Sequence, residues 1–475
     1  MDLLKKLFLT YLLSCLALGL FAQQGVWYSY DQVYYKIPTA KDGIYRISPA
    51  TLQSAGINLS TTDPRNIRMF HRGKEVAIYI EGEQDGRLNE GDYIDFYGIR
   101  NDAKLDSILY RDVKPIPNPY FNTHTDTTAY FLTVANSPGK RMAVRGTPAA
   151  TAPQIQSYQS ERLQVFSDQY SLGISYTLGF RLSSYDQGQG WMSSVISKGA
   201  TRQVPFGELG VPASSGDPYL EIGLTGRSAN AHRARITAGV SGTSQRQVGV
   251  QDFSGFNTVF ARIPLRMTDF NANGSIVISV TPIGPEAADN ISITYAKIRY
   301  SKNKGTGDFG SELLINPAGN QQIQYSSIAG NYAAVEISDP SNPVRVSLSK
   351  NSGNLSLQAA VEGKESKIWL ENEDVIQKVT EVKPIKFRDY LGQAADYILV
   401  GSKALQRPSK NFQNPLKAYA EHRASPQGGA YDTLTLIMED IYDQFGYGER
   451  SPIALYEFLK AYYPVHKPTH ILMAG

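Results

Sequence analysis

The chain has 475 residues, of which 41% are hydrophobic and 19% charged, so it has room for roughly two to four folded domains and is too apolar to be mainly disordered. Its 47 basic and 44 acidic residues give a formal charge of +3. This near balance argues against a nucleic-acid-binding protein, which needs a strongly basic face. We expect no nucleic-acid partner.

Residues 1–22 have the pattern of a secretory signal peptide. Lys5 and Lys6 precede an apolar run from Leu7 to Phe21, and the small residue Ala22 stands before Gln23. The run is shorter than the roughly 20 residues that a transmembrane helix requires. We therefore predict cleavage between Ala22 and Gln23 and an exported protein.

The single cysteine, Cys15, lies inside this apolar run. The sequence Leu12–Cys15 has the spacing of a lipoprotein signal, which is an alternative, although processing there would leave an apolar start to the mature chain. After cleavage at Ala22 no cysteine remains, so residues 23–475 hold neither a disulfide nor a cysteine nucleophile.

Residues 23–150 are predicted to form an N-terminal β-rich domain. Short runs with a period of two are separated by turn residues, which is typical of strands. One short helix is expected at Pro49–Gly56. The predicted strands are Val33–Ile37, Gly43–Ile47, Val76–Ile80, Asp92–Gly98 and Ala129–Val134.

Residues 151–375 are predicted to form a sandwich-like β region, and the Pro-, Ala- and Thr-rich stretch 145–156 marks its boundary. The clearest strands are expected in 219–226, 232–240, 274–282 and 291–300, and a further β segment runs from Asn331 to Leu370. No repeat of fixed period is present, which argues against a solenoid or a propeller.

The pattern changes in residues 386–475. Asp396–Gly401 and Thr433–Met438 read as buried strands of a parallel sheet. Asn414 is a plausible N-cap for a helix that starts at Pro415. A second helix is expected after Ser451–Pro452.

That second helix has an apolar stripe at Leu455, Phe458, Leu459 and Tyr462. Pro464 and Pro468 are expected to bracket a short connection, and His470–Ala474 starts a third strand. Strand–helix–strand–helix–strand is the beginning of an α/β layered fold. A sheet of three such strands would leave a bare edge, so we expect the sequence to be the front part of a longer protein and its last 90 residues to fold poorly alone.

The C-terminal pattern resembles the opening of a caspase-like, gingipain-type domain of the C25 cysteine peptidases. The resemblance is carried by "ADYILVGSKAL", "EHR", "IYDQFGYGERSP…LYEFLKAYY" and "PTHILMAG". Upstream, "GKEVAIYIEGEQDGRLNEGDYIDFYG" and Ser184–Met192 are similar to segments of the type IX secretion sortases of Bacteroidota, the PorU type. The resemblance departs from the family at Tyr456, where the family usually carries Arg.

The resemblance implies an exported cysteine endopeptidase that cuts C-terminal sorting signals from secreted cargo. The implied place is the outer-membrane surface, reached through the periplasm, and the implied partners are cargo proteins, outer-membrane secretion components and lipopolysaccharide. The catalytic His and Cys of the family lie beyond the third strand, so we assign no catalytic residue here and expect residues 1–475 to be inactive alone. The alternative is a non-catalytic exported adhesin or glycan-binding protein with a degenerate α/β tail.

Several polar residues invite functional hypotheses. The loop Glu81–Asp92 partly matches the residue spacing of a calcium-binding loop. However, the side chains of Glu81 and Glu83 are longer than those of the usual Asp residues. An acidic turn of a β-hairpin explains the same sequence equally well. We predict no other cofactor or metal. Tyr442, Phe445 and Tyr447 could pack as a turn or line a cleft.

Two more groups are interpreted as structural. One is a set of acidic residues before the predicted second helix, where negative charge stabilises a helix N-terminus. The alternative is a role in general acid–base catalysis. These residues are Glu439, Asp440, Asp443 and Glu449. The other is the histidines, none of which has a recognisable nucleophile beside it: His71, His124, His232, His422, His466 and His470.

Overall fold

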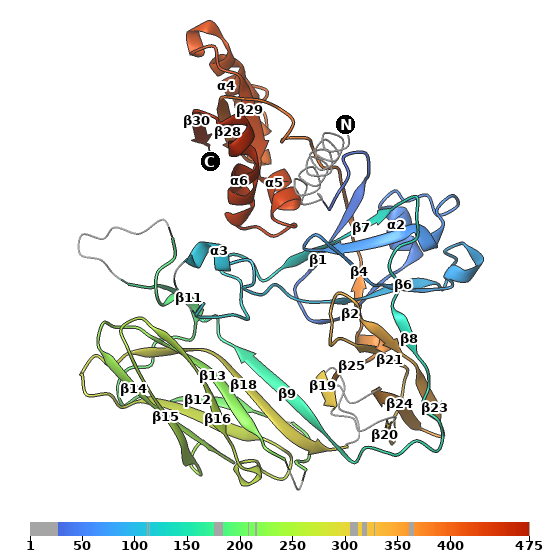
Figure 1. The fold of residues 1–475 in the computed structure, drawn as a ribbon, viewed down its shortest axis with the longest axis vertical. Helices are drawn as coiled ribbons and strands as arrows, with labels where there is room; N and C mark the ends of the chain where they lie inside the picture. The colour runs from blue at the N-terminus through green and yellow to red at the C-terminus, as the bar shows by residue number, and fades with distance from the viewer. Residues whose placement is uncertain are drawn as a thin grey trace, which may run out of the picture.

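The computed structural model describes residues 27–474 apart from 112, 114, 175–183, 208, 214–215, 305–311, 316–320, 327 and 361–364. The predicted signal peptide and its cleavage site at Ala22–Gln23 lie outside the described residues. Along the chain, β-sheets come first and a small α/β layer comes last (Figure 1). This is the β-rich fold followed by an α/β start that the sequence predicts.

Two facing sheets form the first region, here called the N-terminal domain. Its core is one cluster of buried side chains from both sheets, including Ile37, Ile47 and Leu132. The first sheet has the order β27-β1-β7-β3-β4: Lys383–Ile385, Tyr34–Thr39, Thr128–Val134, Ile67–His71 and Lys74–Val76. The second has the order β26-β2-β6-β5: Gln377–Val379, Gly43–Ile47, Tyr93–Gly98 and Tyr79–Glu81.

The helix expected at Pro49–Gly56 is α2, Pro49–Ser54, and Ser48 caps it by accepting a hydrogen bond from the Thr51 amide. The single strand predicted at Val76–Ile80 is wrong, because the chain there leaves one sheet as β4 and enters the other as β5. Between them, the Ala77 amide donates to the Ser341 carbonyl. Strand β3, Ile67–His71, was not predicted.

The central region is a β-sandwich. One layer is the sheet β12-β17-β14-β15, and the other is one half of a nine-stranded sheet, β16-β13-β18-β9. Aliphatic side chains such as Leu220, Ile236 and Ile278 fill the space between them. In the order just given, the strands are Arg202–Phe206, Ile276–Pro282, Ala231–Gly239, Arg246–Ser254, Thr258–Pro264, Tyr219–Gly226, Ile291–Asn303 and Ser157–Val165.

The nine-stranded sheet continues as β19-β25-β21-β22-β8: Glu312–Ile315, Ser366–Asn372, Tyr332–Glu336, Val344–Val346 and Ala143–Arg145. A small sheet contributes to a second core cluster with this half: β20 (Gln321–Tyr325), β24 (Asn354–Ala360) and β23 (Leu348–Asn351). Strands β10 (Gln169–Leu172) and β11 (Gln189–Met192) form a separate, antiparallel two-stranded sheet. Short helix α3 is Ser107–Tyr110.

The last part, here called the α/β segment, has a parallel three-stranded sheet in the order β29-β28-β30: Thr433–Ile437, Tyr397–Gly401 and His470–Met473. The central strand β28 is buried at all five residues, as its continuous apolar run predicts. Edge strand β30 is mostly exposed, with Ile471 and Met473 reaching solvent.

Three helices accompany these strands: α4 (Pro415–Ala424), α5 (Met438–Phe445) and α6 (Ile453–His466). The predicted cap is confirmed, since Asn414 accepts a hydrogen bond from the Lys417 amide. The predicted stripe of α6 is also confirmed, with Phe458 and Tyr462 buried in the core of the segment.

Two details of the α/β prediction are wrong. Helix α5 was not predicted; it starts directly after β29 with no side-chain cap. Pro464 lies inside α6 instead of ending it, and the last turn is held where the His466 ring bonds the Leu391 carbonyl at 2.7 Å.

Among the helices in the described part of the chain, none combines the length and the hydropathy needed to cross a bilayer.

Candidate functional site at the junction of two regions

The carboxyl ends of the parallel strands carry the loops that approach the N-terminal domain. Strand β28 leads into residues 402–406, and β29 leads into α5 and then the loop 446–452 before α6. Figure 1 shows α5 and α6 on the side of the α/β segment nearer to the N-terminal domain. In parallel α/β sheets this edge is where ligands bind, because the loops converge there.

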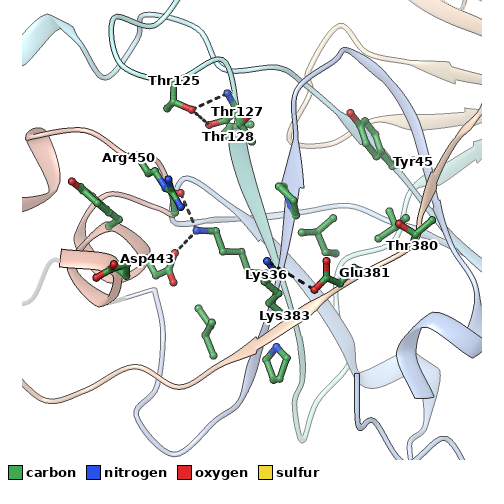
Figure 2. Close-up of a pocket in the computed structure, with 18 of the residues that line it drawn as sticks. Lys36, Tyr45, Thr125, Thr127, Thr128, Thr380, Glu381, Lys383, Asp443 and Arg450 are labelled. Atoms are coloured by element: carbon green, nitrogen blue, oxygen red, sulfur yellow. Dashed lines mark hydrogen bonds and ion pairs between the residues drawn. The ribbon is translucent and has the colours of Figure 1, made fainter. Parts of the chain in front are cut away.

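Lys36 of β1 connects the two regions. Its ammonium donates to the carboxylate of Asp443 in α5 and, at 3.0 Å, to the carbonyl of Gly448 (Figure 2). Burial raises the pKa of Asp443 above its usual value, although the Lys36 charge opposes that rise. A cation from the first β-strand therefore holds both a helix and the loop that follows it.

Glu449 is the centre of a second, buried contact. Only 1% of its side chain is exposed, and its Oε1 accepts from Arg72 Nε at 2.8 Å and from the Thr128 hydroxyl at 2.8 Å. The same Arg72 reaches Asp102 at 2.7 Å and Asn101 at 2.6 Å. Burial raises the pKa of Glu449, against the lowering effect of Arg72.

His71 extends this network by one hydrogen bond. Its Nε2 lies 3.1 Å from the Thr128 hydroxyl oxygen, and its ring stacks on Tyr130. Because the Thr128 proton goes to Glu449, the imidazole must be the donor, which fixes the proton on Nε2. Burial lowers the pKa of His71 to about 3, so the ring is neutral at physiological pH.

Aromatic rings form a third contact, here called the aromatic clasp. Trp27 is at its centre and Tyr447 of the loop joins it at 6.3 Å between ring centroids. The other rings in contact with Trp27 belong to the N-terminal domain or to the segment that follows β27: Tyr28, Tyr34, Phe70, Phe131 and Phe387. Nearby, Gln444 of α5 donates to the Tyr28 hydroxyl and to the Arg388 carbonyl.

Beside the contact of Lys36 with Asp443 lies a cavity of about 750 Å³, here called the junction cavity. The N-terminal domain supplies Lys36, Thr125, Thr127 and Thr128 among others, residues within 377–385 supply one flank, and the α/β segment supplies the rest (Figure 2). The residues from the α/β segment are Lys403, Glu439, Tyr442, Asp443, Gly448 and Arg450.

Comparison with known proteins finds a similarity in this segment. Residues 390–475 match Peptidase family C25. The match covers the three-stranded sheet, its three helices and the loops at its carboxyl edge. No curated protein matches the sequence.

Solved structures extend the likeness to the β-rich regions. The crystal structure of dimeric latent PorU from Porphyromonas gingivalis aligns with a TM-score of 0.59 and 15% identity over 94% of this chain and 42% of that chain. The chain therefore has the fold of a PorU-like region that ends in C25 sequence, and it spans less than half of the PorU chain.

Two carbohydrate-binding modules also align, with far lower scores. One is the CBM36-1 domain of a multidomain xylanase from the hindgut metagenome of Trinervitermes trinervoides, with a TM-score of 0.19 and 14% identity over 29% of this chain and 95% of that chain. The other is a CBM36 module in complex with calcium and xylotriose, with a TM-score of 0.18 and 10% identity over 30% of this chain and 99% of that chain. Scores this low carry no argument about fold or ligand.

The acidic residues predicted to favour the N-terminus of the second helix have different places. Glu439 and Asp440 are in the first turn of α5, where their charge favours a helix that was not predicted, and not beside the start of α6. Asp443 and Glu449 instead pair with Lys36 and Arg72 of the N-terminal domain. That part of the prediction is wrong, because the partners of these carboxylates lie hundreds of residues away.

The aromatic residues near α5 divide in the same way. Tyr442 lines the junction cavity, Phe445 packs against Phe458 of α6, and Tyr447 joins the aromatic clasp. The expected packing is therefore confirmed for Phe445 and Tyr447, and a substrate cleft at Tyr442 stays a prediction.

The remaining histidines are held by structural contacts. His124 bonds the Tyr185 hydroxyl, and His232 lies buried between Asp289 and two backbone carbonyls. His422 is in the last turn of α4, and His470 stacks on Tyr397.

The acidic loop Glu81–Asp92 uses its carboxylates internally and on a neighbour. Glu83 pairs with Arg141, Asp85 accepts from the Arg87 amide and the Asn89 side chain, and Asp92 accepts from the Asn89 amide. In the described ranges, no three His, Cys, Asp or Glu side chains converge as metal ligands.

Proposed function

We propose that this chain is the N-terminal part of an exported cysteine endopeptidase of the type IX sortase kind, which cleaves C-terminal sorting signals from secreted cargo. The observation that carries the proposal is the C25 match over 390–475, in a chain with a PorU-like fold. The signal-peptide pattern of residues 1–22 supports export.

The contacts at the junction support a positioning role for the N-terminal domain. Lys36, Arg72 and Trp27 hold the α5–α6 loop at the carboxyl edge of the C25 sheet. A loop fixed by a buried ion pair and packed rings loses little entropy when a substrate binds. In this proposal the N-terminal domain orders the substrate cleft and forms one of its walls.

The chemistry of such a peptidase needs a thiolate nucleophile and an imidazole that takes up the thiol proton. The only cysteine of this chain is Cys15, within the predicted signal peptide. The proposal therefore requires a cysteine from outside residues 23–475, and the resemblance places the catalytic histidine beyond the third strand as well. Residues 1–475 alone are expected to be inactive.

The partners and location in the proposal follow from the resemblance to type IX sortases. Cargo proteins would be the substrates, outer-membrane secretion components the neighbours, and an amine on lipopolysaccharide the acceptor of the acyl group. The enzyme would pass through the periplasm and act at the outer-membrane surface.

The test is to express the full reading frame and measure cleavage of a cargo protein at its C-terminal signal, before and after thiol alkylation. Thiol-dependent cleavage is expected from the full protein and none from residues 1–475. Cleavage that survives complete alkylation, or a frame that closes within about 20 residues of Gly475, would contradict a cysteine mechanism. The early end of the frame would favour the non-catalytic adhesin, whereas surviving cleavage would indicate a peptidase that does not use a thiol.

A further inference from the structure

The junction cavity has an unequal set of charges. Five basic side chains line it, against the three carboxylates of Glu381, Glu439 and Asp443. The basic residues come from three separate parts of the chain: Lys36, Lys378, Lys383, Lys403 and Arg450. The cavity is therefore positive although the whole chain is close to neutral.

Three of the five cations have a carboxylate partner. Lys36 pairs with Asp443, Lys403 Nζ lies 3.2 Å from Asp440, and Lys383 Nζ lies 3.9 Å from Glu381. For Arg450 and Lys378, the described part of the chain offers no carboxylate within 4.0 Å. These two exposed cations are free to meet an incoming anion.

The rest of the lining suits an extended chain. Figure 2 shows Thr125 and Thr127 near Arg450, and Thr380 on the opposite flank beside Glu381. Ile37, Pro38, Pro384 and Ile385 add apolar surface. The volume of about 750 Å³ lies in the range of sites for organic ligands, and is far larger than a single inorganic anion needs.

We propose that the junction cavity binds an acidic stretch of a peptide, whose carboxylates pair with Arg450 and Lys378 and whose backbone bonds to the threonine hydroxyls. An arginine can receive a carboxylate through two parallel hydrogen bonds, so Arg450 is the stronger anchor. This inference rests on the proposed function and adds to it a class of substrate: cargo with Asp or Glu near the cleavage region.

The experiment measures binding without cleavage. A fluorescein-labelled peptide with four Glu residues, and the same peptide with four Gln residues, are titrated with the full-length protein after thiol alkylation and followed by anisotropy. The Glu peptide is expected to bind about tenfold more tightly, and raising the salt from about 0.05 to 0.3 M should reduce the difference because these cations are exposed.

Substitutions test which residues of the cavity bind the peptide. The double variant Arg450→Gln with Lys378→Gln should weaken binding of the Glu peptide about tenfold, and Arg450→Lys should recover only part of the loss. Lys410→Gln is the matched control, since Lys410 is an exposed lysine of the same segment that does not line the cavity. It should bind as the parent chain does.

Equal binding of the Glu and Gln peptides would overturn the inference. So would a double variant that binds like Lys410→Gln, or displacement of the peptide by inorganic phosphate at micromolar concentration, which would indicate a phosphate site. Because no cleavage is measured, the binding result stands apart from the alkylation experiment, and either proposal can fail alone.

Discussion

Arg72 and Glu449 lie 377 positions apart in the chain, yet Arg72 Nε is 2.8 Å from Glu449 Oε1 and only 12% and 1% of the two side chains are exposed. Arg72 follows β3 with a positive φ of 45°, and Glu449 follows Gly448, whose φ is 82°. Two unusual turns, one from each region, thus place opposite charges in a buried site. This pair is the most specific contact of the junction.

Arg72→Ala is expected to loosen the α5–α6 loop, because Glu449 would remain buried without its cation. Loss of one partner of a buried pair costs about 3–5 kcal/mol. Hydrogen exchange at the amides of residues 446–450 would measure this as faster local opening. Since burial raises the pKa of Glu449, part of the loss should be recovered as the pH falls and the carboxyl group takes up a proton.

The control is Asp252→Asn, which breaks a pair of similar geometry at the surface, where Arg233 Nε lies 2.7 Å from Asp252. Exposed ion pairs contribute little, so local exchange there should not change. Equal effects at both sites would show that burial at the junction is not what makes the Arg72 contact strong.

Gly448→Ala is expected to displace the loop from the N-terminal domain. A Cβ at this position would lie 2.5 Å from the Ala129 Cβ and 3.0 Å from the Phe131 ring, and the φ of 82° is strained for any other residue. Cleavage by the full protein should fall, and exchange at residues 446–450 should rise.

Gly353→Ala separates these two causes. Gly353 has nearly the same φ, 80°, but a Cβ there meets nothing within 4 Å. It reports backbone strain alone, about 1–2 kcal/mol. If Gly448→Ala is no more harmful than Gly353→Ala, close packing of the loop on β7 is not important.

Trp27→Ala should open the aromatic clasp, because Trp27 is the ring that touches both Tyr447 and the N-terminal domain. Removal of a core tryptophan typically costs about 3–5 kcal/mol, and the cost for Trp27 should be smaller because its side chain is only partly buried. Limited proteolysis would detect earlier cutting in residues 446–452. Trp27→Phe should retain most of the protection, and equal sensitivity of the two variants would contradict a packing role.

Asp106 is expected to titrate far from its usual range. Its carboxylate accepts hydrogen bonds from Thr123 and Asn122, but burial raises its pKa to about 6. Between pH 6 and 4 the folded protein holds a proton that the unfolded chain has released, so the contribution of Asp106 to stability increases as the pH falls. At pH 7 its ionisation costs about 3 kcal/mol.

Carbon NMR of the Asp106 carboxyl group would check this through the midpoint of its titration. Asp63 serves as the internal comparison, because its hydrogen bonds to the Arg65 side chain and amide lower its pKa, so it should titrate at the opposite end of the range. An Asp106 midpoint near 4 would show that its hydrogen bonds outweigh burial.

Local patterns were enough to predict many elements of the fold. The continuous apolar run of β28, the stripe of α6 and the Asn414 cap are confirmed, because each depends on residues within one turn or one strand. Helix α5 was not predicted because its local signals are weak. It starts directly after a strand, has no capping side chain, and ends at the glycine- and tyrosine-rich sequence 446–448.

The junction could not be predicted in this way. Alternation in β1 shows which face Lys36 occupies, but not that α5 comes to lie over that face. Glu449 looked like an acid before a helix, and no local signal connected it with Arg72. Partners this distant are set by the packing of whole regions, and the sequence of either region alone does not contain that information.

The return of the chain at β26 and β27 has a mechanical consequence. After the long excursion through the sandwich, Gln377–Val379 and Lys383–Ile385 rejoin the strands β2 and β1 in the two N-terminal sheets. A tension applied to the sandwich, as by a heavy molecule tethered there, would be transmitted through these short strands to β1. Since β1 carries Lys36, which binds Asp443 and Gly448, such a load would reach the α5–α6 loop through these contacts and not along the residues that connect β27 to the α/β segment.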